Sequence, residues 1–477
     1  MSARTVLLAV GFVSCARALA ATPFQLDLPL RDPLQGTSPP VLESGATLPG
    51  EIAPVPCPAG EAFALPLGLG EAVDLALCNN PQIKAAWANI KVQAGALGEA
   101  RAAYLPTLSA TINRLNTHNS YPDSALPGNT NLGTTASATL NWRLFDFGGR
   151  QANREAANRL LIAAIASHDA ALQKTLTGVI QAYFDAQTAQ ATAQAKERNE
   201  TIARSTLDST TRRASRGVAA RSDTLQATTA LAKVTLERNR ARGTYQKALA
   251  VLATSLGISP GTRIVLADDV KDGESNGDNR SLQDWMDIAE QSHPAIRAAR
   301  AEWEASLQKV EVTRSEGMPT LDFSLNHYKN GFPNQGVSSS QSRQTTFGVS
   351  VSIPLFDGFS RTYKIKGAQA QAEQREAQLQ DTQQNVLMEL VKAHADASFA
   401  LDNLQASEQL LMAAQESLDT LRRKYEGGAA DILEILSAQM ALSDAQEERI
   451  RSLSEWRSSR LRLLASAGVM NRSAAGR

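Results

Sequence analysis

The sequence LFDFGG at residues 144–149 recurs as LFDGF at residues 355–359, after an offset of 211 positions. Each copy follows a stretch of alternating apolar and polar residues, and each leads into 67 residues without proline, 149–215 and 359–425. Alternation with period two is typical of a β-strand, and a long polar stretch without proline is typical of a helix. At 1.5 Å per residue each helix would be about 100 Å long. The motif therefore predicts two junctions where a strand passes into a very long helix.

Other motifs repeat in the same order, which indicates that the chain is internally duplicated. NPQI at 80–83 corresponds to HPAI at 293–296, with an offset of 213. Gly217 corresponds to Gly428, with an offset of 211. A nearly constant offset across most of a chain indicates two copies of one structural unit. Each unit is expected to contain a helix, a β-hairpin, a long helix and a shorter helix that returns along it.

Composition and repeats together divide the chain into predicted segments. Ten of the nineteen prolines lie between residues 22 and 66, which excludes a helix there. In order, the segments are a signal peptide (1–20), a proline-rich extended segment (21–66), a first repeat (67–257) with its hairpin at 105–145, an equatorial linker (258–280), a second repeat (281–467) with its hairpin at 319–356, and a C-terminal tail (468–477).

The first twenty residues have the pattern of a secretory signal. Arg4 precedes a short apolar stretch at 5–13, and ALA at 18–20 fits a small-x-small cleavage site. An alternative interpretation makes Cys15 a lipidated residue. The apolar stretch is too short to span a membrane, and no later segment approaches 18 consecutive apolar residues, so no transmembrane helix is expected in the mature chain.

Charge and motif content exclude several classes of function. The 48 basic and 48 acidic residues cancel, so no net field attracts nucleic acid. The five histidines are scattered without the spacing of metal ligands, and there is no glycine-rich phosphate loop. We therefore expect no enzymatic activity, no cofactor and no metal site.

Two cysteines, Cys57 and Cys78, remain in the expected mature chain. In the oxidising compartment that a signal peptide implies, they could form a disulfide. The bond would close a loop of about twenty residues and stabilise the fold by roughly 3 kcal/mol. Two unpaired thiols are the alternative.

Four strand-like stretches are apolar on one face and polar on the other. In the last of them, Phe347, Val349 and Val351 alternate with polar or small residues. Such segments are typical of outer-membrane β-barrels, although an ordinary half-buried hairpin has the same pattern. The polar loops at 116–133 and 327–345 would then be extracellular. Four strands are too few for a barrel, which needs about eight, so subunits must combine, and three would give twelve strands.

These motifs resemble the TolC-like outer-membrane factors. The junctions at 144–149 and 355–359, and the sequence YEGG at 425–428 that leads into LEILSAQ at 433–439, carry the resemblance. It implies a mainly α-helical protein with a membrane β part, a homotrimer with a twelve-stranded β-barrel in the outer-membrane lipid and a periplasmic α-helical tunnel. A periplasmic adaptor and an inner-membrane ABC exporter or proton-driven pump would dock at the closed tip. The proline-rich leader and CNNP at 78–81 further resemble the CyaE-type branch, which serves type I secretion of RTX toxins.

The resemblance also implies where the functional residues lie. The positions offered to the adaptor are Arg216, Gly217, Val218, Gly427, Gly428 and Ala429. The positions expected at the periplasmic aperture are Ser222, Asp223, Tyr425 and Glu434. Threefold symmetry would turn each carboxylate into a ring that selects cations. The simpler interpretation is that both carboxylates stabilise a helix N-terminus. Asp146 and Asp357 are expected to cap the two long helices.

Two departures from the family pattern leave the closing contacts open. Ala430 stands where family members use an arginine, and Ser437 stands where they use a second aspartate. The cargo is also open, because it is chosen mainly by the pump. Toxin secretion is favoured by the CyaE-type features, multidrug efflux is the alternative, and a structural surface stalk is a third hypothesis.

Overall fold

The computed structural model describes residues 66–120, 122, 128–267, 280–331 and 342–470. The predicted signal peptide, the proline-rich segment as far as residue 65, Cys15 and Cys57 lie outside the described residues. So do parts of the predicted loops, most of the linker and the end of the tail.

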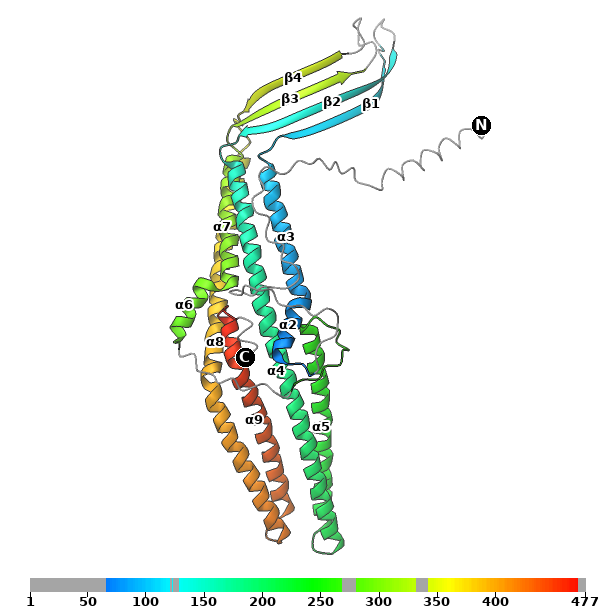
Figure 1. Cartoon of the computed structure of the whole chain (residues 1–477), viewed down its shortest axis with the longest axis vertical. Helices are drawn as coiled ribbons and strands as arrows, with labels where there is room; N and C mark the ends of the chain where they lie inside the picture. Colours follow the sequence, from blue (N-terminus) through cyan, green and yellow to red (C-terminus); the bar gives the residue numbers. More distant parts are fainter. Residues whose placement is uncertain (1–65, 121, 123–127, 268–279, 332–341, 471–477) are drawn as a thin grey trace, which may run out of the picture. The chain divides into compact units, whose positions relative to one another are not determined.

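The described elements form two series of the same kind and order (Figure 1). The first is α2 (Leu69–Asn79), α3 (Pro81–Ala102), β1 (Thr107–Asn119), β2 (Asn129–Phe145), α4 (Gly149–Ser215) and α5 (Arg221–Ser255). The second is α6 (Leu282–Ser292), α7 (Pro294–Ser315), β3 (Thr320–Asn330), β4 (Ser342–Ser352), α8 (Ser360–Glu426) and α9 (Ile432–Ser466). Helices α4 and α8 have 67 residues each, and α5 and α9 have 35 each. The duplication predicted from the sequence is therefore present helix by helix.

The first helical tract of each repeat is broken at the proline motif. The Asn80 side chain accepts a hydrogen bond from Gln82 N at 2.8 Å and begins α3, with Pro81 in the first turn. In the second repeat the His293 ring accepts from Ala295 N at 3.2 Å and begins α7 in the same way. Because proline disfavours a helical conformation in the residue before it, each tract becomes two helices.

The strand-to-helix junctions use the two aspartates as expected. Asp146 Oδ2 accepts a hydrogen bond from Arg150 N at 2.9 Å, and Asp357 Oδ2 accepts one from Arg361 N at 2.8 Å. Phe147 and Phe359 lie in the left-handed region, with φ of 52° and 66°. Bulky residues adopt this conformation only at a cost. The junction geometry is therefore imposed on the chain in both repeats.

The four strands form one antiparallel sheet in the order β1-β2-β3-β4. The central pairing, β2 with β3, joins the two repeats. Strands β1 and β4 each have one edge that no strand of the described chain occupies. The second hairpin is shorter than the predicted 319–356, because β4 ends at Ser352.

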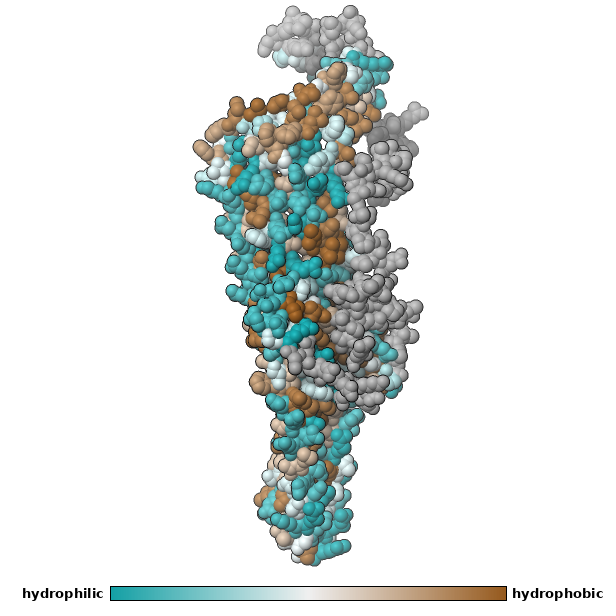
Figure 2. Space-filling view, turned by 60° about the vertical axis from the view of Figure 1, so that its left-hand side comes forward, coloured by the Kyte–Doolittle hydropathy of each residue, from teal (hydrophilic) through white to brown (hydrophobic). Residues whose placement is uncertain are grey.

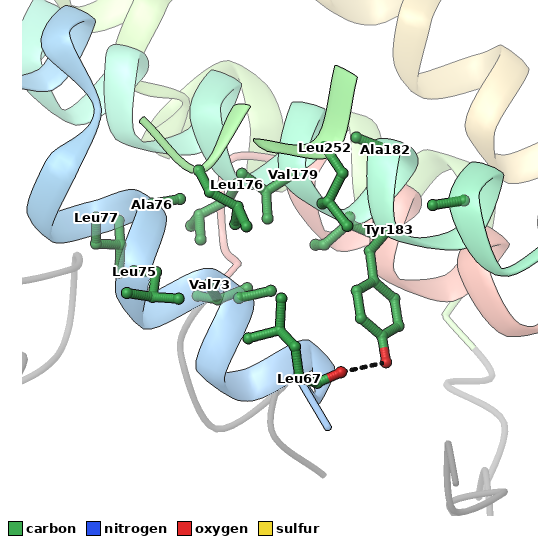
Figure 3. Packing of buried hydrophobic residues seen from close by; sticks show 14 of the residues in the cluster. Leu67, Val73, Leu75, Ala76, Leu77, Leu176, Val179, Ala182, Tyr183 and Leu252 are labelled. Atoms are coloured by element: carbon green, nitrogen blue, oxygen red, sulfur yellow. Dashed lines mark hydrogen bonds between the residues drawn. The ribbon is translucent and has the colours of Figure 1, made fainter. Parts of the chain in front are cut away.

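The main apolar core lies around the middle of α4, where α2, α5 and the segment after α5 pack on it (Figure 3). Leu67 is fully buried there, its carbonyl accepts a hydrogen bond from Tyr183 Oη at 3.3 Å, and it forms a bridge with Leu266. A matching cluster in the second repeat is centred on Trp285 and Leu390. Among the described residues, no helix combines the length and the apolarity that crossing a membrane requires.

Candidate functional site

One face of the sheet is apolar and exposed. In a water-soluble protein, other elements would cover such a face. Leu108 and Ile112 of β1 are 74% and 75% exposed, and Phe347 and Val351 of β4 are 74% and 60% exposed. The space-filling view shows apolar residues gathered over the strands, whereas the helices carry a mixed surface (Figure 2). The opposite face carries hydroxyl, amide and charged groups, including the ion pair of Arg143 with Asp322 at 3.0 Å. One face suits hydrocarbon and the other suits water.

Aromatic rings are grouped at the point where each hairpin meets its long helix. Phe145 packs edge-to-face on Phe147 with ring centroids 4.8 Å apart, and Phe356 packs on Phe359 at 5.7 Å. All four rings are more than half exposed. Exposed aromatic rings beside an apolar sheet are typical of the boundary between lipid and water.

The opposite ends of the long helices form the tip, defined here as residues 213–223 and 424–434. Gly217 and Gly428 both have φ of 75° and follow the last turn of α4 and of α8. The amide of Val218 donates to Arg213 O at 3.0 Å, and the amide of Ala429 donates to the equivalent Lys424 O at 2.8 Å. Nothing lies within 4 Å of a side-chain position at either glycine. Glycine is therefore required by the left-handed backbone and not by lack of space.

The residues predicted to meet the adaptor are all exposed on these two turns. They are Arg216, Gly217, Val218, Gly427, Gly428 and Ala429. Val218 is the apolar member and is 62% exposed. The tip thus offers two similar loops, each with a short small-residue or apolar segment.

The two predicted aperture carboxylates have different surroundings. Asp223 is half-buried, and its carboxylate accepts hydrogen bonds from Ala220 N at 3.3 Å and Ser222 Oγ at 3.1 Å. It therefore helps to begin α5. At the start of α9, Asp431 performs that task by accepting from Glu434 N at 2.9 Å. The exposed Glu434 carboxylate has no hydrogen-bond partner among the described residues.

Tyr425 is 6% exposed and packs in an apolar cluster between α8 and α9. The Arg213 guanidinium lies over its ring at 4.6 Å and donates to the Tyr425 carbonyl at 2.8 Å and to the Glu426 carbonyl at 3.2 Å. Ala430 packs against the same cluster. The Arg213 guanidinium of α4 thus contacts the end of α8. In the family pattern, an arginine stands at the position of Ala430, which follows α8.

A cavity of about 520 Å³ lies between the two returning helices, α5 and α9, and residues of α4 and α8 complete its lining. Its apolar lining includes Leu225 and Val234 of α5 and Leu433, Leu436 and Met440 of α9. Ser437, the second departure from the family pattern, also lines it. The sequence did not reveal this groove, because it depends on how two separate helical hairpins lie together.

Cys78, at the end of α2, is disulfide-bonded. The other two cysteines of the chain, Cys15 and Cys57, lie outside the described residues. The pairing of Cys57 with Cys78 therefore stays a prediction.

A family model described as "Outer membrane efflux protein" matches residues 72–258 and again residues 285–469. Each matched range begins near the start of one repeat and ends after its returning helix. The chain belongs to the outer membrane efflux protein family. This membership confirms the resemblance to TolC-like proteins, and it makes the chain a subunit of a trimeric outer-membrane channel of a tripartite export system, without enzymatic activity.

Individual family members match most of the chain. Protein CyaE of Bordetella pertussis is 36% identical over 89% of both chains. The alkaline protease secretion protein AprF of Pseudomonas aeruginosa is 24% identical over 86% of both chains. The crystal structure of the outer membrane protein VceC of Vibrio cholerae has a TM-score of 0.72 at 22% identity, covering 84% of this chain and 96% of that chain. That structural likeness shows the fold alone.

Membership in the outer membrane efflux protein family assigns a location to the sheet and to the helices. The predicted fold, location and channel function are confirmed, and the hypothesis of a surface stalk is wrong. The apolar sheet face belongs to the membrane β part, and the helices belong to the periplasmic extension. The contact that Arg213 makes between helices could not be predicted from the sequence. Its one signal was a basic residue at the same place in both repeats, since Lys424 lies 211 positions after Arg213.

Proposed function

We propose that this channel serves type I secretion of a protein cargo, an RTX or cyclolysin-like toxin. The observation that carries the proposal is the 36% identity to CyaE over 89% of both chains. A second relative, AprF, is named as a protease secretion protein. Multidrug efflux is the alternative function, since the family model itself is described as an efflux protein.

Reconstitution of secretion tests the cargo. The chain would be expressed in cells that lack their own outer-membrane export channel, together with the ABC exporter, adaptor and toxin of a type I system. We expect toxin in the medium and little change in drug resistance. If drug resistance returns with a proton-driven pump, and no toxin leaves the cell, the efflux alternative is correct.

We further propose that the tip binds a periplasmic adaptor. Two features support this: the exposed glycine turns around Gly217 and Gly428, and the groove between α5 and α9. The lining of the groove includes the exposed apolar residues Leu225, Leu433 and Met440, and an apolar stripe of a helical hairpin would fit it. Replacing Leu433 by Glu should abolish cross-linking to the adaptor, whereas Leu236→Glu on α5, outside the groove lining, should preserve it.

The same tip is proposed as the periplasmic aperture, with Glu434 as its acidic ring. The exposed Glu434 carboxylate supports this role, and the engagement of the Asp223 carboxylate in the start of α5 argues against Asp223 as the main ligand. Three carboxylates near one axis repel one another, and a multivalent cation relieves that repulsion.

Channel block tests the acidic ring. A trivalent cation, hexaamminecobalt(III), added on the tip side of a planar bilayer should reduce the conductance of the trimer. Glu434→Gln should remove most of the block, and Asp223→Asn should remove little of it. If Glu434→Gln leaves the block unchanged, Glu434 does not form the ring.

A further inference from the structure

The apolar face of the sheet changes character toward the loop end of the second hairpin. Directly paired residues of antiparallel strands project to the same side, so each pair of β3 with β4 belongs to one face. Three successive pairs of the lipid-facing side are apolar. They are Leu321 with Val351, Phe323 with Val349 and Leu325 with Phe347. The next two pairs on this side, toward the loop, are His327 with Thr345 and Lys329 with Arg343.

Lys329 and Arg343 are therefore two cations directly opposite each other on one face. Both residues are exposed, and neither has an acidic partner among the described residues. Asp322 is the only carboxylate in the sequences of the four strands, and it lies on the opposite face in an ion pair with Arg143. Like charges directly opposite in a sheet destabilise the pairing. The described chain itself offers nothing that relieves this repulsion.

The two cations lie at the outer edge of the apolar band. The segment from Leu321 to Lys329 is about 26 Å long at 3.3 Å per residue. At a strand tilt near 40° it spans roughly 20 Å of depth, close to the height of the apolar band of an outer-membrane barrel, which is about 25 Å. The helices begin at the other end of the strands, on the periplasmic side (Figure 1). The cation pair is therefore at the level of the lipid head groups of the outer leaflet.

The same tilt separates this pair from the β1 edge of the sheet. Ile112 of β1 belongs to the same row, through Ala136 of β2. Across three strand spacings of about 4.8 Å, a row perpendicular to tilted strands changes depth by roughly 9 Å. Ile112 and the cation pair thus lie at different depths. Arg114 is the third cation of this face, and it stands opposite Thr134 rather than another charge.

The groups beside the cation pair are polar on one side and apolar beyond. The His327 ring nitrogen Nδ1 lies 2.9 Å from Thr345 Oγ1, in the adjacent row. Phe347 follows in the next row and is 74% exposed. A ligand that fits this surface has an anionic head group and an apolar part directly below it. This is the chemistry of a membrane lipid with phosphate groups.

We propose that Lys329 and Arg343 bind the phosphate groups of lipopolysaccharide, the anionic glycolipid of the outer leaflet. A phosphate between the two side chains replaces their repulsion by charge-assisted hydrogen bonds. Arginine binds phosphate with its planar fork, and lysine binds it as a point charge. The acyl chains of the same lipid lie against Phe347. The site depends on the outer-membrane location of the sheet and not on the cargo or the adaptor.

Titration of the detergent-solubilised trimer with lipid A, followed by native mass spectrometry, tests the site. The double variant Lys329→Gln, Arg343→Gln should bind lipid A about 25-fold more weakly, since each basic residue at a membrane surface contributes about fivefold. Lys329→Arg should bind like wild type, because it keeps the cation. An unchanged affinity in the double variant would overturn the proposal.

The inner face of the same sheet supplies the matched control. Arg143→Gln combined with Asp322→Asn removes a cation together with its carboxylate, so that no unpaired charge is left behind. This variant should bind lipid A like wild type. All variants are first compared as heat-modifiable trimers, so that a loss of assembly is not mistaken for a lost site. If the control loses as much affinity as the double variant, the outer face is not the binding site.

Thermal stability gives a second readout with a change of sign. In neutral detergent without lipid A, the double variant should melt above wild type, because the repulsion of Lys329 and Arg343 is gone. With lipid A the order should reverse, because wild type gains the binding free energy. Lipid A without its phosphates should not reverse the order. If wild type melts higher in neutral detergent and gains nothing from lipid A, the two cations have a structural role and the proposal is wrong.

Inorganic phosphate distinguishes a lipid site from a site for a free anion. The ion shares the phosphate chemistry but lacks the acyl chains that lie against Phe347. Lipid A should therefore stabilise the wild-type trimer at far lower concentrations than inorganic phosphate does. Equal stabilisation by both at the same concentration would contradict the assignment to a lipid.

Discussion

The two repeats of the chain are equal in dimensions but differ in chemistry at their ends. Their helices match residue for residue in length, 67 and 67 for the long pair and 35 and 35 for the returning pair. At the tip, however, the first repeat uses the Asp223 carboxylate to begin its returning helix, whereas the second uses Asp431 and leaves the Glu434 carboxylate exposed. Duplication preserved the scaffold, and the helix ends diverged.

This difference shows that residues at equivalent positions of the two repeats need not have the same role. Arg213 and Lys424 are equivalent by offset, yet Arg213 joins α4 to α8, while Lys424 is exposed in the last turn of α8. Length and register are set by backbone geometry, which both repeats share. Roles are set by the partner that each side chain meets, and the two repeats meet different partners.

The largest expected effect tests what the repeats share, the lipid-facing sheet. Val351→Arg in β4 and Ile112→Arg in β1 should each cost about 2–4 kcal/mol if they lie at mid-depth in the bilayer, and should reduce the outer-membrane trimer. Heat-modifiable trimer on gels measures this. Ser350→Arg, on the other face of β4, is the control and should be milder. Equal losses for Val351→Arg and Ser350→Arg would mean that the faces are misassigned.

A smaller effect should separate the two carboxylates at the tip. Asp223→Asn removes a carboxylate from the first turn of α5, and we expect a loss of about 0.3–1 kcal/mol of helix stability at that end. Glu434→Gln should cost less, because the carboxylate has no partner among the described residues. Hydrogen exchange of the amides at residues 221–226 and 432–437 measures both. Faster exchange only in Glu434→Gln would reverse the distinction.

The smallest expected effect concerns pH and the helix caps of the two repeats. Burial lowers the pKa of His293 below 6.5, and its neutral ring accepts the hydrogen bond from Ala295 N. Because the folded pKa is the lower one, this stabilisation is present above pH 6.5 and is lost as the pH falls through the folded pKa. Asn80, the equivalent cap, does not titrate in this range. His293→Asn should therefore remove part of the acid destabilisation measured by thermal melts between pH 7 and 5, and identical pH profiles would contradict the cap.

Much of the fold could be predicted because its signals are local and occur twice. The predicted helix 149–215 coincides with α4, and the predicted helix 359–425 is shifted by one residue relative to α8. Prolines, glycines and alternating strand segments mark the ends of helices and strands at corresponding places in both repeats. The breaks before Pro81 and Pro294 were not predicted, although the residue before a proline seldom remains helical.

Contacts between the hairpins could not be predicted from one chain's pattern. Lys196 reads as an ordinary helix-surface residue in sequence, yet its ammonium group meets two acidic partners, 41 and 251 positions later. The groove between α5 and α9 likewise depends on the packing of separate elements. Such features follow from helix rotation and spacing, which periodicity alone does not determine.

Surface labelling in whole cells tests the central claim most directly, namely that the chain crosses the outer membrane at its sheet and extends its helices inward. Cysteines would be placed at Ser120, which follows β1, and at Val218, which lies on the tip. A membrane-impermeant maleimide should label Ser120→Cys on intact cells, and should label Val218→Cys only after the outer membrane is permeabilised. Labelling of Val218→Cys on intact cells, with Ser120→Cys protected until permeabilisation, would contradict the account.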